Sequence, residues 1–208
     1  MANLDLKKAL KQFYAPKAKD VSMVDVPAMN FLCVDGEGNP NTAPLYVEAI
    51  QALYPLAYSI RGISKAQGRV FTVMPLEGLW WFKDDPITNF VITEADKDRF
   101  LWTMMILQPD FVDAHMVEEA RAAVLAKKEV PAQVEQVRFE RFHEGEAVQL
   151  MHIGPYADEG PNIRKLHEYV EENGWQLSGK HHEIYLSDPR KVAPEKMRTV
   201  VRQPFTRN

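Results

Sequence analysis

The sequence predicts an α+β domain in which a mainly antiparallel sheet carries helices on one face. The prediction rests on the order of the periodic segments, because both halves of the chain read strand, loop, long helix and then two more strands. The first unit covers about 21–83 and leads into a strand at 99–107, and the second covers about 137–202. The halves share this order without sharing sequence. The predicted architecture is therefore a tandem strand–helix–strand–strand repeat of the α+β class.

The N-terminal segment stands apart from this repeat. Apolar residues at helical spacing over 4–13 predict a short helix, and APKAKD at 15–20 reads as a linker. No later segment looks like a boundary between domains. The predicted organisation is a helix and linker over 1–20, then one domain over 21–208, with pseudo-repeats at about 21–112 and 137–204.

The first repeat begins with strand-like segments at 21–27 and 29–34. A helix follows from near Thr42 or Pro44, and we expect Pro55 to kink or end it, because proline lacks the N–H that the helical ladder needs. Downstream, we expect Val70–Met74 and Gly78–Lys83 to pair as a hairpin, followed by a strong strand at 99–107 (RFLWTMMIL). A helix capped by Asp113 is then expected to run to Lys127–Lys128.

The last third repeats the pattern. Gly174, just past the predicted helix, suits the left-handed residue that ends many helices. The expected elements are strands near Val137–Phe142 and Ala147–Ile153, a helix over about Pro161–Glu172, and strands near Trp175–Leu186 and Met197–Arg202.

Composition and charge exclude several classes of protein. The formal net charge is −4 with basic residues scattered among acids, which argues against nucleic acid as a partner, because phosphate contacts need clustered Lys and Arg. No run approaches the ~20 apolar residues of a membrane span, and the N-terminus lacks a signal-peptide pattern. The lone Cys33 excludes an internal disulfide and fits a reducing compartment. We expect a cytoplasmic protein without a cofactor. Whether two chains form a homodimer stays open.

The strand at 99–107 is apolar on both faces, whereas a sheet with helices on one face normally shows polar residues on the other. Either it is a wide central strand covered by helices and by a loop or subunit, or one face lines a pocket for a flat guest. Trp80 and Trp81 add to this apolar excess. Alternation puts Phe100, Trp102, Met104 and Ile106 on one face and Leu101, Met105 and Leu107 on the other.

Residues 181–187 (HHEIYLS) bring a carboxylate to the same sheet. Alternation places Ile184 on a face that we expect to lie under the helices, and His181, Glu183 and Tyr185 on the opposite face. Burial in an apolar pocket would raise the pKa of Glu183 unless Tyr185 or a cationic guest holds it ionised. The alternative is an exposed edge strand on which Glu183 and His181 are solvated.

Metal and nucleophile motifs are not found. His181 and His182 are adjacent and so point to opposite faces of a strand, and the chain has no H-E-x-x-H and no cysteine pair at zinc spacing. Cys33 lies among apolar neighbours, which is typical of packing rather than of catalysis. We therefore expect no metal site.

Several segments, in order along nearly the whole chain, resemble the GyrI-like small-molecule-binding family, in particular its long stand-alone bacterial members. The most specific is the tail. The matching segments are DLKKALKQFYAPKAKDVSMVDVPAMNFLCVDGEGNPN (5–41), WW (80–81), RFLWTMMILQPDFV (99–112), HIGPYADEGPNIRKLHEY (152–169) and HHEIYLSDPRKVAPEKMRTVVRQP (181–204).

The resemblance implies a curved sheet of the GyrI-like or SHS2 type, whose concave face binds bulky, often cationic, aromatic compounds. The family uses a glutamate in a late strand and a ring of aromatic residues, and Glu183 falls at that glutamate, whereas Pro55 departs from the family's pattern. The candidate catalytic residues are Glu183 and Tyr185. The candidate ligand-binding residues are Trp80, Trp81, Trp102, Met104, Tyr156, Tyr46 and His181.

Some stand-alone members are reported as hydrolases that open the strained cyclopropane of DNA-alkylating antibiotics, which implies protection against xenobiotics. An ionised Glu183 could take a proton from water while a phenol or amide donates to the oxygen that gains charge. The alternatives are a non-catalytic drug-sequestering protein and a gyrase-inhibitor-like partner. No DNA-binding segment precedes the fold in this sequence, which counts against a transcriptional sensor.

Overall fold

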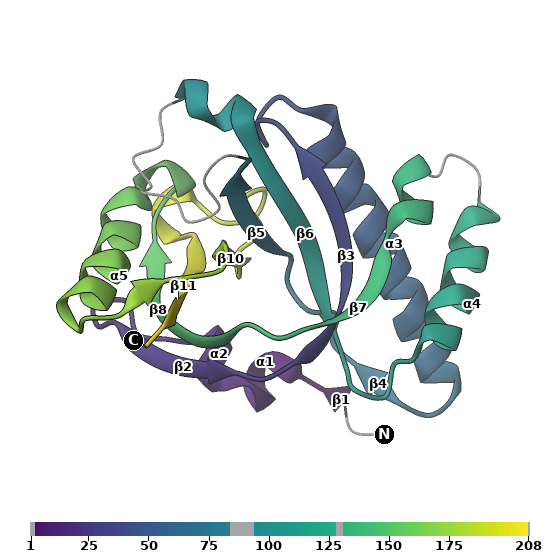
Figure 1. The fold of residues 1–208 in the computed structure, drawn as a ribbon. Coiled ribbons are helices and arrows are strands. Elements are labelled where there is room, and N and C mark those ends of the chain that lie inside the picture. Colours follow the sequence, from purple (N-terminus) through teal and green to yellow (C-terminus); the bar gives the residue numbers. More distant parts are fainter. Residues whose placement is uncertain (1–2, 84–93, 128–130, 208) are drawn as a thin grey trace.

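A curled, nine-stranded antiparallel sheet dominates the computed structural model, which describes residues 3–83, 94–127 and 131–207 (Figure 1). Its strands are β2 (Ser22–Val26), β3 (Met29–Glu37), β5 (Glu77–Phe82), β6 (Phe100–Gln108), β7 (Arg138–Phe142), β8 (Gly145–Ile153), β9 (Gln176–Leu177), β10 (His181–Tyr185) and β11 (Arg198–Thr206). A separate parallel pair joins β1 (Asn3–Leu4) to β4 (Val70–Phe71).

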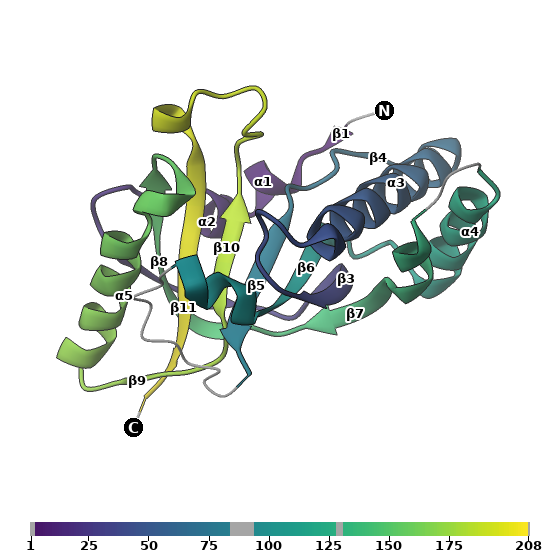
Figure 2. The ribbon, with the colours of Figure 1, turned by 90° about the horizontal axis from the view of Figure 1, so that it is seen from above.

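Helices cover the sheet. The α-helices are α1 (Leu6–Ala9), α2 (Lys11–Tyr14), α3 (Pro44–Ala66), α4 (Ala114–Leu125) and α5 (Gly160–Glu172), and the 3₁₀ turns are η1 (Glu94–Arg99), η2 (Ala132–Gln136), η3 (Tyr156–Asp158) and η4 (Pro194–Lys196). Helices α3 and α5 lie on the same face of the sheet, with β10 and β5 between them (Figure 2), and α4 packs on α3.

The strand order confirms the predicted tandem repeat. The sheet reads β2-β8-β11-β10-β5-β6-β3-β7, with β9 paired to β11. The first unit, β3-α3-β5-β6, appears in space as β5-β6-β3, and the second, β8-α5-β10-β11, appears as β10-β11-β8. The two units meet at the centre of the sheet, where β5 and β10 pair antiparallel. The α+β fold class is confirmed, while the exact domain boundaries stay a prediction.

Each unit takes its outer strand from the other half of the chain. Strand β2 runs into β3 but pairs with β8, and β7 runs into β8 but pairs with β3. The registers Val26 with Gly145 and Met29 with Phe142 bring the two short connections alongside each other. The resulting two-stranded ribbon crosses from one end of the sheet to the other and closes its curl, along the bottom of Figure 1.

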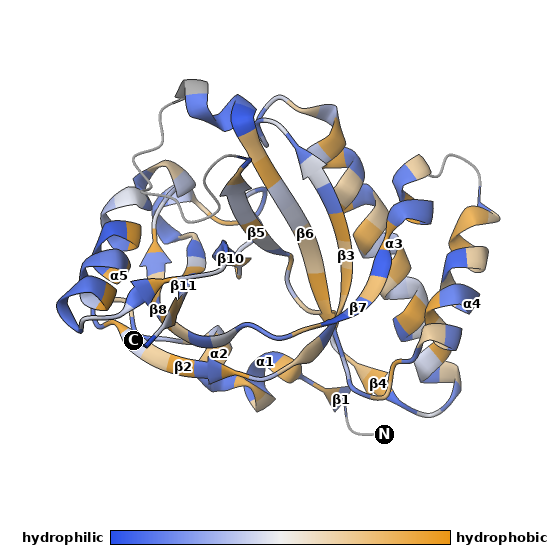
Figure 3. Ribbon diagram, in the orientation of Figure 1, coloured by the Kyte–Doolittle hydropathy of each residue, from blue (hydrophilic) through white to orange (hydrophobic). Residues whose placement is uncertain are grey.

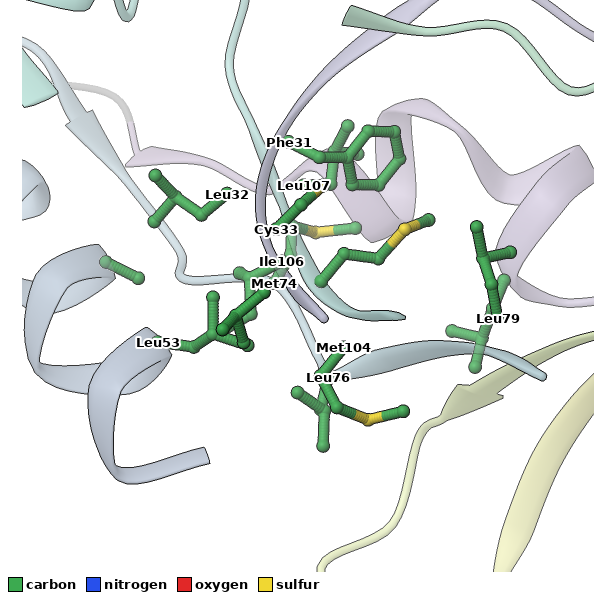
Figure 4. Packing of buried hydrophobic residues seen from close by; sticks show 14 of the residues in the cluster. Phe31, Leu32, Cys33, Leu53, Met74, Leu76, Leu79, Met104, Ile106 and Leu107 are labelled. Carbon is green, nitrogen blue, oxygen red and sulfur yellow. The ribbon is translucent and has the colours of Figure 1, made fainter. Parts of the chain in front are cut away.

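The core lies where α3 packs on β3 and β6, which carry long apolar segments (Figure 3). Leu32 and Ile106 are register partners on the face toward α3, where Leu53 meets them, while Phe31 and Leu79 lie on the other side of the strands (Figure 4). Leu32, Leu53 and Ile106 are fully buried. Burial of one such side chain stabilises the fold by about 1.5–3 kcal/mol relative to its exposure.

Of the two effects expected of Pro55, a kink or an end of the helix, the end does not occur, because α3 continues through Pro55 to Ala66. The side chain of Pro55 is exposed, so the carbonyl oxygen that loses its N–H partner lies on the solvent side of the helix, where water can satisfy it. The opposite side of the same turns buries Leu53 and Leu56, and this packing outweighs one missing hydrogen bond.

The expected hairpin between residues 70–74 and 78–83 is also wrong. Strand β5 is already paired on both edges, with β10 and with β6, so it has no edge left for β4. Strand β4 pairs with β1 instead. The predicted N-terminal helix forms as two four-residue turns, α1 and α2, that meet at Leu10.

Two predicted helix ends are confirmed. The Asp113 carboxylate accepts a hydrogen bond from the Met116 backbone N–H at 2.8 Å, and α4 begins at the next residue, Ala114. Gly174, which follows the C-cap residue Asn173 of α5, has a φ of 73°, in the left-handed region that glycine adopts without a steric penalty.

Candidate functional site

A cavity of about 300 Å³ lies between the facing ends of α3 and α5, over the central strands β5 and β10. Its walls come from separate parts of the chain. Its lining residues are Pro40, Asn41, Tyr46, Trp80, Lys97, Phe100, Tyr156, Ala157, Glu159, Gly160, Ile163, Glu183 and Tyr185. We refer to this cavity as the Glu183 pocket.

Strand register brings the central residues of this pocket together. His181 is opposite Trp80, Glu183 is opposite Gly78, and Trp80 is opposite Trp102. Directly paired residues of antiparallel strands point to the same face. The alternation predicted for 181–185 therefore holds, and β10 lies between β5 and β11 rather than at an edge.

The assignment of the two faces was wrong. Ile184 was expected under the helices, but the Glu183 face carries them, since Tyr46 of α3 and Ile163 of α5 line the pocket. Ile184 pairs with Glu77 on the other face, where Tyr14 of α2 donates a hydrogen bond to Glu77 at 2.7 Å. The short N-terminal helix covers that face, and alternation alone could not tell which face the long helices cover.

Glu183 is held by a chain of hydrogen bonds at the bottom of the pocket. The Trp80 indole N–H donates to the Tyr185 hydroxyl at 2.9 Å, and that hydroxyl donates to Glu183 Oε2 at 2.8 Å. His181 Nε2 lies 3.4 Å from Glu183 Oε1, and the His181 side chain itself is fully buried. The Glu183 side chain keeps 15% of its surface exposed, which faces the pocket.

Glu159, at the start of α5, is the functional candidate that the sequence did not reveal. Only 4% of its surface is exposed, and it shares a hydrogen bond with Glu183. Burial, and then the charge of Glu183, raise the pKa of Glu159 well above its usual range. An acidic residue at the N-terminal end of a helix is common and usually solvated, so the position of Glu159 just before α5 is a weak signal in the sequence.

The pKa of Glu183 moves in the opposite direction. Burial alone would raise it, but hydrogen bonding and charge from His181, and hydrogen bonds from Tyr185 and Glu159, together lower it. Ionising both of two carboxyl groups in contact is unfavourable, because their negative charges repel each other. The pair therefore holds one proton, on Glu159, and one negative charge, on Glu183.

Gly78 allows this packing because it has no side chain. A Cβ atom there would lie 2.6 Å from Met104 Cε, 2.7 Å from Trp80 Nε1 and 3.1 Å from the Tyr185 hydroxyl oxygen. Any larger residue at this position would push apart the indole and the phenol that hold Glu183.

Aromatic rings form the walls around the carboxylates. The Tyr46 ring lies 6.1 Å from the Trp80 ring, and Trp80 meets Phe100 edge-on at 5.3 Å. Tyr156 meets Tyr185 edge-on at 5.6 Å. Burial, with the nearby Glu159 and Glu183, raises the pKa of Tyr156 to about 12, so its phenol stays protonated. The pocket thus combines aromatic faces and phenol donors with the Glu183 anion, and the Lys97 side chain also lines it.

Four of the predicted site residues do not line the pocket. Trp102 and Met104 lie on the same face of the sheet but are fully buried, and the Trp102 ring packs on Gly36, where a Cβ would lie 2.0 Å from the ring. His181 shares the face of Glu183 but is fully buried. Trp81 points to the other face of the sheet, because neighbouring residues of a strand alternate. The pocket brings together the remaining five: Tyr46, Trp80, Tyr156, Glu183 and Tyr185.

Within residues 3–83, 94–127 and 131–207, no group of three or more His, Cys, Asp and Glu side chains could hold a metal ion. No helix in the same part of the chain has the length and apolar character needed to cross a membrane.

Comparisons with known proteins show close relatives of the whole chain. A crystal structure of a conserved Listeria innocua protein is 40% identical, with a TM-score of 0.88 over 98% of this chain and 100% of that one. A second, described as a hydrolase from Listeria innocua, is 41% identical, with a TM-score of 0.83 over the same shares. The C-terminal domain of EcmrR shares the fold at 16% identity, with a TM-score of 0.58 over 91% of this chain and 98% of that domain.

A search of proteins with curated descriptions gives no match. The family whose sequence model matches is described as the GyrI-like small molecule binding domain, and the match covers residues 19–205. With nearly the whole chain inside that match, the protein belongs to the GyrI-like small molecule binding domain family.

Proposed function

We propose that this protein hydrolyses electrophilic aromatic compounds by adding water to a strained cyclopropane ring, with Glu183 as the general base. The observation that carries the proposal is the pair of buried carboxyl groups, one ionised and one protonated, at the bottom of an aromatic pocket. The description of a 41% identical protein as a hydrolase supports the reaction class. Such a reaction would protect a cell from DNA-alkylating compounds.

The pocket suits one flat ring system at a time. Its volume of about 300 Å³ is at the lower end of the usual range for ligand pockets, about 300–1,000 Å³. The reacting end of a bulky guest would enter between Tyr46, Trp80 and Tyr156, and the rest would extend beyond the opening. Stacking on these rings supplies binding energy that does not depend on the guest's charge.

The two carboxyl groups have complementary roles in the proposed reaction. Water attacks a cyclopropane carbon, the carbon–carbon bond breaks, and its electron pair moves to a conjugated carbonyl oxygen. Glu183 takes a proton from the water, and Glu159 gives its proton to the oxygen that gains charge. The hydrogen bond between the two carboxyl groups then returns the proton to Glu159. Overall, one water molecule adds to the guest.

A second candidate function is the capture of aromatic cations without reaction. The specific observation in its favour is the anionic Glu183 behind the electron-rich faces of Tyr46, Trp80 and Tyr156. An organic cation in the pocket would gain from both the carboxylate and the ring faces. The same pocket could serve either role, so the two must be separated by the fate of the guest.

The test compares wild type with Glu183→Gln and Glu159→Gln, using a cyclopropane conjugated to an aromatic ketone as the substrate. Product is followed by mass spectrometry in water enriched in heavy oxygen. Glu171→Gln, on the exposed side of α5, is the matched control. We expect Glu183→Gln to lower the rate by about 10²–10⁴-fold, the usual contribution of a general base, and Glu171→Gln to leave it unchanged.

The outcomes separate the two functions. Heavy oxygen in the product from wild type, with the rate lost in Glu183→Gln, supports hydrolysis. If wild type binds the guest tightly and returns it unchanged, the hydrolase proposal is wrong and cation or drug capture replaces it. If neither the cyclopropane nor an aromatic cation binds, the pocket has no ligand of this class.

A further inference from the structure

A second and larger cavity lies on the face of the sheet opposite the Glu183 pocket. Its volume is about 470 Å³, and it is bounded by β3, β5, β6 and β7 and by residues 178–180, which lead into β10. Its floor is apolar and includes Leu79, Trp81 and Met105. This cavity has the size and the apolar floor of a small-molecule site.

The two cavities share a sheet but no residue. Trp80 and Trp81 are neighbours on β5, and alternation sends Trp80 into the Glu183 pocket and Trp81 into the second cavity. The second cavity is therefore a separate site whose occupant would not touch Glu183.

Among the residues that the structure describes, the carboxylates and Arg138 at the second cavity are held in ion pairs, Glu144 by His182 and Arg202, whereas Lys180 forms none. Arg138 is held by Asp35, with N–O distances of 2.8 and 3.2 Å, and by Glu140 at 3.2 Å. Lys180 Nζ instead lies 3.2 Å from the centre of the Trp81 ring. Burial lowers the pKa of Lys180. A partly desolvated ammonium over an indole ring would gain from a carboxylate of a guest.

We propose that the second cavity is a binding site for small aromatic carboxylates, independent of the proposed hydrolysis. The ring of the guest packs on Trp81, Leu79 and Met105, and its carboxylate pairs with Lys180. The two sites then differ in chemistry, because the guest faces the Glu183 carboxylate in the first pocket and the Lys180 ammonium, which lies over the Trp81 ring, in the second cavity. One chain would carry two ligands of opposite charge preference on the two faces of its sheet.

The test uses 2-naphthoate as the probe in isothermal titration calorimetry, with 2-naphthylmethylammonium as the charge-reversed analogue. We expect one naphthoate site per chain. Lys180→Gln removes a hydrogen bond between two charged groups and should weaken naphthoate binding by about tenfold or more. Lys180→Arg keeps the positive charge and should restore most of the affinity. Glu183→Gln, on the other face, should change the affinity by less than about twofold.

A thermal unfolding curve for each variant controls for folding. Lys180 is only partly buried, so both substitutions are expected to leave the midpoint unchanged. The proposal is overturned if naphthoate does not bind at millimolar concentration, or if Lys180→Gln binds it as wild type does. It is also overturned if Glu183→Gln abolishes naphthoate binding, or if the ammonium analogue binds in a manner that depends on Lys180.

Discussion

His182 lies at the centre of a buried ionic network, and the network predicts how stability depends on pH. His182 Nδ1 is 2.8 Å from Glu144 and Nε2 is 3.1 Å from Glu77, while Arg202 meets the other Glu144 oxygen at 2.7 Å. Burial alone would lower the pKa of His182, but the charge and hydrogen bonds of Glu144 and Glu77 raise it from 6.5 to about 9. His182 is therefore protonated in the folded protein at neutral pH.

This raised pKa makes stability fall in mildly alkaline solution. The folded protein holds the His182 proton up to about pH 9, whereas the unfolded chain releases it near 6.5. The stabilisation is fully present below pH 6.5 and is lost as pH rises through 9. Since one pKa unit corresponds to about 1.4 kcal/mol, His182 contributes about 3 kcal/mol that disappears across this window.

The assay is urea unfolding followed by tryptophan fluorescence, from about pH 6 to about pH 10, for wild type and His182→Gln. We expect wild type to be the more stable at the acidic end and its advantage to shrink by about 3 kcal/mol toward the alkaline end. Groups outside the network titrate equally in both proteins and cancel in the difference. His115→Gln, on the exposed side of α4, is the control and should change nothing. An advantage that stays constant with pH would refute the reasoning.

Three further substitutions test the packing. Gly36→Ala sets a Cβ 2.0 Å from the indole above it and should lower the free energy of unfolding by about 1–3 kcal/mol; an unchanged urea midpoint would contradict this. Pro55→Ala restores an N–H inside α3 and should raise that free energy by about 1–2 kcal/mol, whereas a lower value would mean that the proline has a stabilising role. Gly78→Ala should separate Trp80 from Tyr185 and slow the proposed hydrolysis by about tenfold or more, and a wild-type rate would show that their hydrogen bond is dispensable.

Much of the fold could be predicted from local patterns. Strand alternation showed which residues of β6 and β10 share a face, and the Asp113 cap and Gly174 marked two helix ends, because these signals depend on residues close together in the chain. The tandem order of elements was enough for the fold class. Alternation does not show which strands pair with each other. The strand at β4 was therefore predicted to pair with β5, whereas it pairs with β1.

The site was harder to predict because its chemistry comes from contacts between distant segments. Glu183 and Tyr185 are two residues apart and could be placed on one face, but Glu159 meets Glu183 only through the packing of α5 on the sheet. Trp80 and Trp81 could not be separated until the register of β5 was known. That nucleic acid is not a partner and that the protein is cytoplasmic stay predictions. Whether two chains form a homodimer stays open.

The exchange of outer strands between the two repeats has a consequence for folding. Because β2 completes the sheet of the second repeat and β7 completes that of the first, neither repeat has a full set of strands on its own. Contacts such as Val26 with Gly145 join residues far apart in the chain, so we expect slow folding and a single cooperative unfolding transition. If the chain were cut in the connection between the repeats, the two fragments would each stay incomplete and would recover their structure only by associating.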